Sequence, residues 1–357
     1  MTAWLERLTP KNIRNLIPYS SARREATRGE VWLNANENPF SRSSGEFPSA
    51  LNRYPEFQPV ALLEAYSQYA GVAMDQLLIT RGIDEGLDLL IRSFCTGGED
   101  QIVYTPPTYG MYRITAETHD VNCMPTPLLP EWKLDLPQVI VEAGDSKLVF
   151  LCSPNNPTGN LIKQSKVIQI LEATRNQTLV VLDEAYIEFA PEASYVKLLA
   201  DYPNLIVLRT LSKAFGLAGL RCGFILASPE IISVIKKVTP PYPIPVPVAD
   251  LAIAALGERG IQRMKREVNQ IQSSRDDLVE KLKHFSFVQK IYPGKANFVL
   301  VRVNDAVALM EAIEGRGVVI RNQSKQFQLD NCVRISIGAP EELESLLEAF
   351  QDYESQL

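Results

Sequence analysis

Short apolar runs alternate with amphipathic segments through the middle of the chain. Runs such as Leu205–Leu208 are rich in leucine and β-branched residues without alternating polar positions, which indicates strands buried on both faces. Segments such as Asp84–Phe94 and Gln164–Arg175 read as amphipathic helices between these runs. Strands separated by helices predict an α/β fold with a mostly parallel sheet. The predicted strands are Leu77–Thr80, Gln101–Tyr104, Lys147–Cys152, Leu179–Leu182, Asn204–Leu208 and Gly223–Ala227.

A Pro-rich segment, residues 240–247, interrupts this pattern. Because proline does not fit a helix interior or a central strand, the segment predicts a rigid, extended passage out of a large domain that spans residues 31–247. Residues 248–357, together with residues 1–30, are expected to form a smaller α+β domain and an N-terminal arm. Its predicted elements are a helical region Val248–His284, strands Phe298–Arg302, Val318–Arg321 and Val333–Ile337, and a final helix from Glu341.

The composition narrows the class of protein. With 357 residues, 46% of them hydrophobic and 22% charged, the chain is long enough for a large core. A net charge of −6 without a basic run argues against a nucleic-acid partner. No apolar run reaches the ~18–20 residues that cross a bilayer, and the first residues lack the apolar stretch of a signal peptide. We therefore expect a cytoplasmic protein with no membrane partner.

The scarcity of metal-binding side chains limits the possible chemistry. The five cysteines are scattered and have no C-x-x-C spacing, which indicates reduced thiols. Neither of the two histidines, His119 and His284, lies near a cluster of ligand residues. We expect no metal site and no Ser-His-Asp hydrolase, so the chemistry is expected to come from a cofactor.

The run Leu205–Leu208 leads to a lysine flanked by hydroxyl groups. Ser212 and Lys213 follow it, and Arg221 comes eight residues after the lysine. A desolvated lysine near other cations loses its proton readily and can form a Schiff base with an aldehyde. This combination suggests pyridoxal 5′-phosphate (PLP), with Lys213 for the aldehyde and Ser212 and Arg221 for the phosphate. On these residues alone, a surface lysine is an equal alternative.

Two other predicted strands also end in polar residues. Asp183 follows Leu179–Leu182, and an acid at the end of a buried strand needs a partner. In a PLP enzyme that partner is the protonated pyridine nitrogen, and Tyr186 is spaced to donate to the phenolic oxygen. Asn156 lies in a turn stiffened by two prolines after Lys147–Cys152. A helix-capping acid and a plain turn are the alternatives.

Further candidates have weaker individual signals. Gly82 opens a helix whose free N–H groups suit a phosphate, although the acids that follow it also suit the helix dipole. Tyr109 follows two prolines in a loop suited to stacking a ring on a flat cofactor, or to a plain turn. Arg321 and Arg334 lie in apolar runs, where an arginine has either a substrate anion or a structural acid as its partner.

The order of these blocks resembles that of the fold-type I PLP-dependent aminotransferases, and within them the histidinol-phosphate aminotransferase family. The match runs from about residue 12 to the C-terminus. Its blocks are NANENP, RYP, RGIDEGLDLLIRSFC, PPTYGMY, CSPNNPTG, LDEAYIEF, LRTLSKAFGLAGLRCG, PYPIPVPVAD and CVRISIG. Ile83 stands where the family often has a smaller residue. Because that position would use its backbone N–H group, the departure changes little.

The resemblance implies a role for each candidate. Lys213 would hold PLP, Asp183 would pair with its ring nitrogen, and Tyr109 would stack on its ring. Asn156 and Tyr186 would hold the phenolic oxygen. The residues implied at the phosphate are Gly82, Ile83, Asp84, Thr210, Ser212, Arg221 and Tyr54 of the partner subunit. The residues implied at the substrate are Tyr19, Asn36, Arg321 and Arg334.

The resemblance also implies a homodimer with shared active sites and a reaction. The reaction is transamination between L-histidinol phosphate and 2-oxoglutarate, giving imidazole-acetol phosphate and L-glutamate, in histidine biosynthesis. One substrate carries a phosphate where the other carries a carboxylate, and a guanidinium pairs with either anion. A threonine-phosphate decarboxylase or an aromatic aminotransferase of the same fold, and a non-catalytic PLP-fold binding protein, remain as alternatives.

Overall fold

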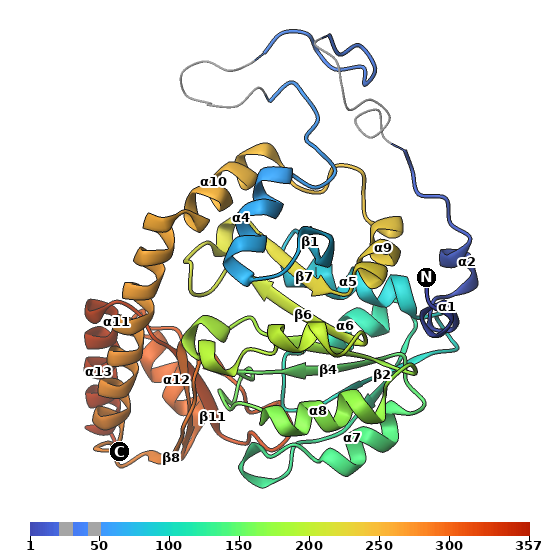
Figure 1. The fold of residues 1–357 in the computed structure, drawn as a ribbon. Coiled ribbons are helices and arrows are strands. Elements are labelled where there is room, and N and C mark those ends of the chain that lie inside the picture. Colours follow the sequence, from blue (N-terminus) through green and yellow to red (C-terminus); the bar gives the residue numbers. More distant parts are fainter. Residues whose placement is uncertain (21–30, 42–50) are drawn as a thin grey trace.

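The computed structural model describes residues 1–20, 31–41 and 51–357, and its strands form two sheets in this part of the chain (Figure 1). The strands are β1 (Leu77–Thr80), β2 (Gln101–Tyr104), β3 (Asn122–Pro125), β4 (Leu148–Cys152), β5 (Leu179–Asp183), β6 (Leu205–Thr210), β7 (Gly223–Ala227), β8 (Val288–Tyr292), β9 (Phe298–Val303), β10 (Arg321–Asn322) and β11 (Cys332–Ser336).

Helices flank both sheets. The α-helices are α1 (Ala3–Leu8), α2 (Lys11–Arg14), α4 (Val60–Ala70), α5 (Ile83–Phe94), α6 (Met111–Thr118), α7 (Leu136–Ala143), α8 (Gln164–Ala173), α9 (Pro229–Val238), α10 (Val246–Leu256), α11 (Glu258–Leu282), α12 (Ala306–Glu314) and α13 (Pro340–Glu354). The short 3₁₀ helices are η1 (Met74–Gln76), η2 (Pro130–Trp132), η3 (Ile187–Phe189), η4 (Pro191–Ala193), η5 (Val196–Ala200) and η6 (Ala218–Leu220). None of the helices in the described residues is long and apolar enough to cross a membrane.

The large sheet has the strand order β1-β7-β6-β5-β4-β2-β3. The neighbours from β6 through β3 pair in parallel, and β7 runs antiparallel to both β1 and β6. Every residue of β1, β4, β5, β6 and β7 is buried, which explains why their sequences are mostly apolar and do not alternate with polar residues. The predicted mostly parallel sheet is confirmed.

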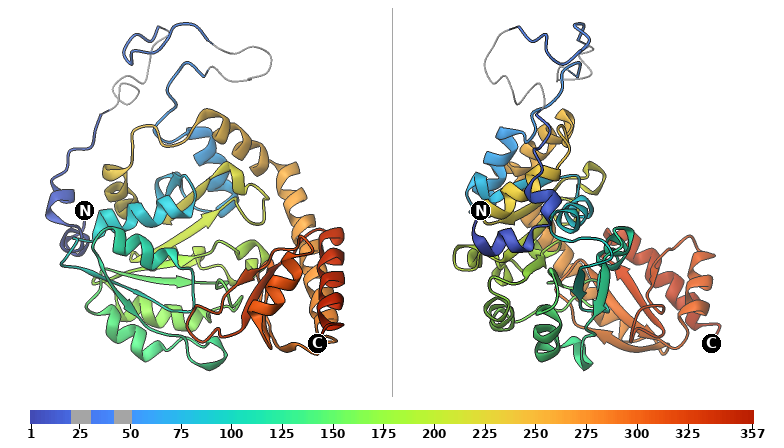
Figure 2. Two further views of the ribbon diagram at one scale, coloured as in Figure 1. Left: turned by 180° about the vertical axis from the view of Figure 1, so that it is seen from behind. Right: turned by 90° about the vertical axis from the view of Figure 1, so that its right-hand side faces the viewer.

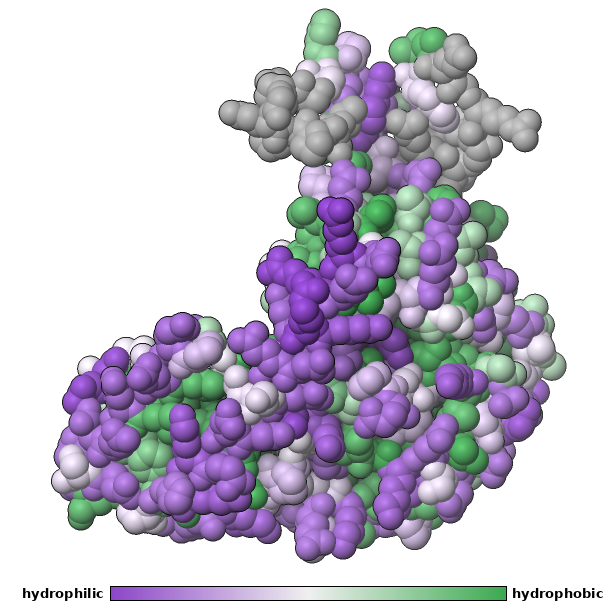
Figure 3. Space-filling view, turned by 60° about the vertical axis from the view of Figure 1, so that its left-hand side comes forward, coloured by the Kyte–Doolittle hydropathy of each residue, from purple (hydrophilic) through white to green (hydrophobic). Residues whose placement is uncertain are grey.

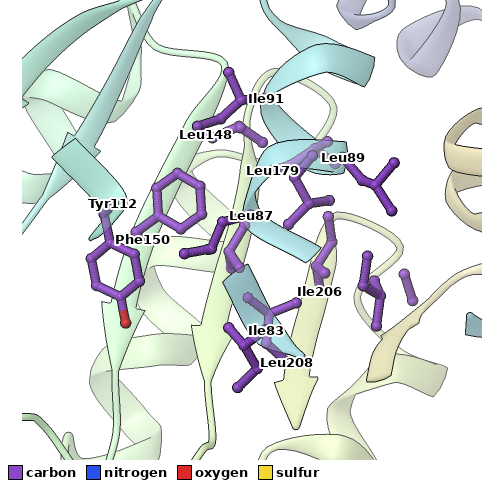
Figure 4. Packing of buried hydrophobic residues seen from close by; sticks show 14 of the residues in the cluster. Ile83, Leu87, Leu89, Ile91, Tyr112, Leu148, Phe150, Leu179, Ile206 and Leu208 are labelled. Carbon is purple, nitrogen blue, oxygen red and sulfur yellow. The ribbon is translucent and has the colours of Figure 1, made fainter. Parts of the chain in front are cut away.

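Alternate residues of these strands enter two apolar cores, one on each face of the large sheet. One core joins Phe150 and Ile206 to α5, α6 and α9, and Figure 4 shows α5 lying across the strands. The other core joins Val149 and Val207 to α4, α7, α8 and α10. Both faces are therefore closed to water, and the strand ends are left as the place where polar side chains can gather.

The small sheet has the order β10-β11-β9-β8, with all pairs antiparallel. Its apolar face packs on α11, α12 and α13 through residues such as Leu282, Leu309 and Phe350. Figure 2 shows these C-terminal elements beside the large sheet, with the C-terminus on their far side. This agrees with the predicted smaller α+β unit.

Some boundaries differ from the sequence-based predictions. The helical region predicted at Val248–His284 consists of α10 and α11, which meet at Gly257. Helix α10 begins inside the Pro-rich segment because Pro247 lies in its first turn, where a missing N–H group costs nothing. The strand predicted at Val318–Arg321 is the two-residue β10. Strands β3 and β8 were not predicted, since both carry exposed polar residues.

The N-terminal helices α1 and α2 lie against the large sheet's helices. Leu5 and Ile13 belong to its core, and Lys237 of α9 donates to the carbonyl of Arg14 at 2.7 Å. The sequence grouped residues 1–30 with the smaller domain. Residues 21–30 of that group, with the predicted boundary beside them, lie outside the described residues. The division into residues 31–247 and the remainder stays a prediction.

Candidate active site

The carboxyl ends of the parallel strands open into a cavity of about 590 Å³ that the small sheet closes from one side. The loops after β2, β4, β5 and β6, the start of α5, and the β10–β11 region all line it. The predicted residues that line this cavity are Ile83, Asp84, Tyr109, Asn156, Asp183, Tyr186, Thr210, Ser212, Lys213, Arg221, Arg321 and Arg334.

Lys213 follows β6 and lies open to the cavity. Its Nζ atom is 5.4 Å from the centre of the Tyr186 ring. Enclosure by the pocket walls lowers the pKa of Lys213, and the positive charge of Arg334 lowers that pKa further. The amine is therefore neutral over a wider pH range than a surface lysine, which makes it a better nucleophile.

Asp183 ends β5 and is 3% exposed. Its Oδ2 atom accepts a hydrogen bond from the Tyr112 hydroxyl at 2.7 Å, and its Oδ1 atom accepts one from the Ala185 N–H group at 2.9 Å. Burial raises the pKa of Asp183 to about 6, while these two hydrogen bonds oppose the rise. The cavity therefore presents a buried acid that a protonated ring nitrogen would stabilise.

The start of α5 and the loop after β6 form a site with hydrogen-bond donors. Gly82 precedes α5 with a φ of 83°, and a Cβ atom there would lie 2.6 Å from Nη2 of Arg221. Arg221 Nη1 approaches the Ser212 hydroxyl at 3.4 Å, and that hydroxyl lies 2.9 Å from the hydroxyl of Thr210. Hydroxyl groups, a guanidinium and a helix N-terminus together favour a phosphate.

The carboxylate of Asp84 also enters this group, although the sequence predicted a role for its backbone N–H group. Arg221 Nη2 lies 3.2 Å from Asp84 Oδ2, and the Tyr109 hydroxyl donates to Oδ1 at 2.9 Å. Asp84 thereby orients both the guanidinium expected at the phosphate and the ring expected to stack on the cofactor.

The two arginines of the small sheet are partners across a strand pair. Arg321 of β10 lies directly opposite Arg334 of β11. Arg334 Nη1 donates to Asn156 Oδ1 at 2.5 Å, and its buried Nε has no hydrogen-bond partner among the described residues. Like charges opposite each other destabilise a sheet, so this pair needs an anion between or beside its members.

Tyr19, Asn36 and Tyr54 are not among the residues that line this cavity. The Tyr54 ring stacks on Tyr242, with 4.4 Å between the ring centres, and Tyr19 is 69% exposed. Figures 1 and 2 show residues 15–20 and 31–41 extending away from the large sheet. The predicted roles of Tyr19, Asn36 and Tyr54 at the phosphate and the substrate stay predictions.

Sequence reasoning missed three polar residues at the site. Tyr112 donates to Asp183, and its signal was its place three residues after Tyr109, in the first turn of α6. Gln323 and Gln326 line the cavity beside Arg321, joined by a hydrogen bond of 2.7 Å between their amides. No pattern in the sequence distinguished these glutamines from an ordinary polar loop.

Comparison with known proteins agrees with this geometry. Residues 28–350 match the family model of class I and II aminotransferases. A histidinol-phosphate aminotransferase of Shigella flexneri serotype 5b is 47% identical over 350 residues, which are 98% of each chain.

Two solved structures have the same fold. The histidinol-phosphate aminotransferase of Clostridium acetobutylicum has a TM-score of 0.80 and 27% identity, over 86% of this chain and 92% of that one. The Sinorhizobium meliloti enzyme, solved in complex with PLP, has a TM-score of 0.78 and 25% identity, over 97% and 98% of the two chains. This chain belongs to the class I and II aminotransferases and, within them, to the histidinol-phosphate aminotransferase family.

Proposed function

We propose that this protein transfers the amino group of L-histidinol phosphate to 2-oxoglutarate, giving imidazole-acetol phosphate and L-glutamate. The observation that carries the proposal is the paired Arg321 and Arg334, which lie beside Lys213 in one cavity. This arrangement joins an amine to a site for anions. The 47% identity to a histidinol-phosphate aminotransferase supports this choice of substrates and the place in histidine biosynthesis.

The cavity suits PLP at three points. The buried Asp183 accepts hydrogen bonds from neutral groups and forms no ion pair with another described residue, so a pyridinium nitrogen would supply the missing cation. Lys213 offers an amine with a lowered pKa to the aldehyde. Arg221, Ser212 and the start of α5 offer donors to the phosphate. PLP, when bound, supplies an aldehyde that reacts with amines and a ring that accepts an electron pair.

The residues of the chain then have separate tasks. Lys213 Nζ would hold the cofactor and, once the substrate amine has displaced it, would carry the proton that leaves and returns to the reacting carbons. Asp183 would keep the ring nitrogen charged. Asn156 and Tyr186 would hold the phenolic oxygen, and Tyr109 would cover the ring.

The two arginines explain how one site accepts two kinds of substrate. A guanidinium forms paired hydrogen bonds with a phosphate or with a carboxylate. Arg334 has its Nε group available for such a partner, and Asn156 holds the other end of its guanidinium. The same pair would bind the phosphate of histidinol phosphate and the distal carboxylate of glutamate.

A homodimer with shared sites also belongs to this proposal. Tyr54 of the partner subunit would contact the phosphate, and Tyr19 of the partner subunit would reach the substrate. In the described residues 1–20 and 31–41, the large apolar side chains Ile17, Leu33 and Phe40 are 77–89% exposed. Figure 3 shows hydrophobic groups at the upper end of the molecule. Such a group of apolar side chains is typical of a surface that a second protein covers. A cytoplasmic location is consistent with the five cysteines, which form no disulfide.

A half-reaction assay tests the substrate. We expect L-histidinol phosphate to bleach the absorption of lysine-bound PLP, while L-phenylalanine and O-phospho-L-threonine do so at a much lower rate. Release of carbon dioxide from O-phospho-L-threonine identifies a decarboxylase. A dominant response to phenylalanine identifies an aromatic aminotransferase, and either result excludes the proposal.

Lys213→Ala provides the matched control for this assay. The variant is expected to lack the absorption of lysine-bound PLP and to lose transamination by roughly 10³-fold or more, since a general base and the anchor are removed together. Wild-type protein that binds no PLP would show that the family's chemistry has been lost from this chain.

A further inference from the structure

Tyr112 is a fully buried residue of α6 whose hydroxyl points to the active-site acid. It has no exposed surface, and its Oη atom lies 2.7 Å from Asp183 Oδ2. In Figure 4 the ring lies beside Phe150 and the hydroxyl points in the direction of the strand arrows, toward the carboxyl ends of the sheet. A buried phenol needs a hydrogen-bond partner, and here the partner is the residue predicted to contact the cofactor ring.

We propose that Tyr112 is a positioning residue, whose hydroxyl fixes the carboxylate of Asp183 in the orientation and ionisation state that the ring nitrogen of PLP requires. The inference rests on the proposed PLP chemistry of this site and deepens it by assigning the group that controls Asp183.

The packing of the Tyr112 ring leaves its hydroxyl little freedom. The ring stacks on Phe150 of β4, with 5.2 Å between the centres and 10° between the planes. The edge of Tyr109 contacts it from another side, at 5.7 Å and 85°. Because a core at this density resists side-chain rotation, the hydroxyl is held at one distance from Asp183. The turn that leads into α6 thus places both the ring expected to stack on the cofactor and the donor to the acid.

The charge balance around Asp183 shows why this donor matters. Burial and the nearby carboxylate of Asp84 raise the pKa of Asp183, whereas Tyr112, the Ala185 N–H group and the charge of Lys213 lower it. Burial also raises the pKa of Tyr112 itself, and so does the neighbouring Asp183. The phenol therefore stays protonated and acts as a donor. Once Lys213 is bound to the cofactor aldehyde, Tyr112 and Ala185 remain as the groups that oppose protonation of Asp183.

The test compares Tyr112→Phe with the wild type in PLP binding by the full-length apoenzyme. Phenylalanine keeps the ring that packs on Phe150 and removes the hydroxyl. We expect the dissociation constant for PLP to rise roughly 10- to 100-fold, the range for a lost hydrogen bond to a charged group. The acidic limb of the pH profile of kcat/KM is expected to move to higher pH, because the pKa of Asp183 rises without its donor.

An analogue of PLP with carbon in place of the ring nitrogen separates positioning from packing. Wild type and Tyr112→Phe should bind this analogue with equal affinity, since Asp183 then has no pyridinium to stabilise. An equal loss of affinity for PLP and for the analogue would show that Tyr112 only supports the shape of the cavity, and the proposal would be wrong.

Tyr195→Phe is the matched control. Tyr195 is also buried, and its hydroxyl donates to the Ile162 carbonyl at 2.5 Å, away from the residues that line the cavity. This variant should keep the wild-type affinity ratio between PLP and the analogue and the wild-type pH profile. Because the binding measurements use no substrate, failure to transaminate histidinol phosphate would refute the proposed function and leave this inference intact.

Discussion

The guanidinium of Arg334 interacts with three different neighbours at or beside the cavity. Nη1 donates to Asn156, the positive charge lowers the pKa of Lys213, and the guanidinium carbon lies 5.3 Å from the centre of the Phe298 ring. A planar group can meet these demands together with a substrate anion, whereas an ammonium is a compact point charge with a different geometry.

Arg334→Lys separates the charge from the planar geometry. We expect KM for glutamate to rise roughly 10- to 100-fold, because a charged, paired hydrogen bond is lost, with a smaller change in kcat. Steady-state kinetics with histidinol phosphate and with glutamate measures both substrates. An unchanged KM for both would remove Arg334 from the anion site. Lys325→Arg, on the exposed loop after β10, should leave both values as in the wild type.

Candidate residues at strand ends could be identified because their chemistry stands out against the apolar run before them, although each residue alone left a structural alternative open. Lys213 and Asp183 each follow such a run, and both line the cavity. Tyr112 could not be distinguished in this way, since a tyrosine on a helix that packs on a sheet looks like part of the core. The pairing of Arg321 with Arg334 depends on strand register, which no local pattern reveals.

The segment that follows β5 joins the cavity to a buried charge cluster. Glu184 pairs with Arg209 of β6 at 2.8 Å, and Tyr69 of α4 donates to Glu188 of η3 at 3.4 Å. Gln272 of α11 donates to the carbonyl of Phe189 at 2.8 Å. The short helix η3 that follows Tyr186 is therefore fixed by hydrogen bonds from two other helices.

Glu188 makes this element sensitive to pH. Burial raises the pKa of Glu188 from 4.5 to about 7, and Arg209 opposes the rise while Glu184 adds to it. The Glu188 carboxyl ionises near pH 4.5 in the unfolded chain and near pH 7 in the folded protein. The wild-type free energy of unfolding therefore decreases as the pH rises from 4.5 to 7. The loss is at most about 3 kcal/mol and levels off above pH 7.

Glu188→Gln should remove this part of the pH dependence. Urea unfolding of the PLP-saturated enzyme at pH 5 and pH 8 measures it, and the variant should lose less stability between the two values than the wild type. Glu192→Gln changes an exposed acid of the adjacent η4 and should behave as the wild type. If Glu188→Gln and the wild type lose the same free energy of unfolding between pH 5 and pH 8, ionisation of Glu188 does not destabilise the folded protein.

The elements themselves were predicted best where they are buried on both sides. Strands β4, β5 and β6 lie within two residues of their predicted limits because all their side chains are apolar or buried. Strand β3 lies at the edge of the sheet with exposed ends, so its sequence carries no strand signal. The break at Gly257 was missed because amphipathic spacing continues on both sides of it.

At the scale of the whole molecule, one chain provides most of the proposed site but leaves Tyr54 outside its own cavity. Tyr54 is 49% exposed, and its ring stacks on Tyr242 outside the cavity. In the proposed homodimer with two-fold symmetry, a Tyr54 that reaches the other subunit's cavity does so at both sites, because the same surfaces meet in both directions. The site of one subunit would then be completed by the other.

Mixing an inactive variant with one of low activity tests this sharing of residues. Lys213→Ala lacks the cofactor anchor, and Tyr54→Ala lacks the residue supplied to the neighbouring site, so its activity should be low at limiting PLP. After dissociation and reassembly, a mixed dimer would contain one site with both Lys213 and Tyr54 intact. Half of the randomly assorted dimers are mixed, so activity should return to about one quarter of the wild-type value per chain.

Lys213→Ala mixed with Asp183→Asn is the control, because both changes affect residues that a chain supplies to its own site. That mixture should stay inactive, and equal recovery in both mixtures, or none in the first, would show that Tyr54 does not act across the interface.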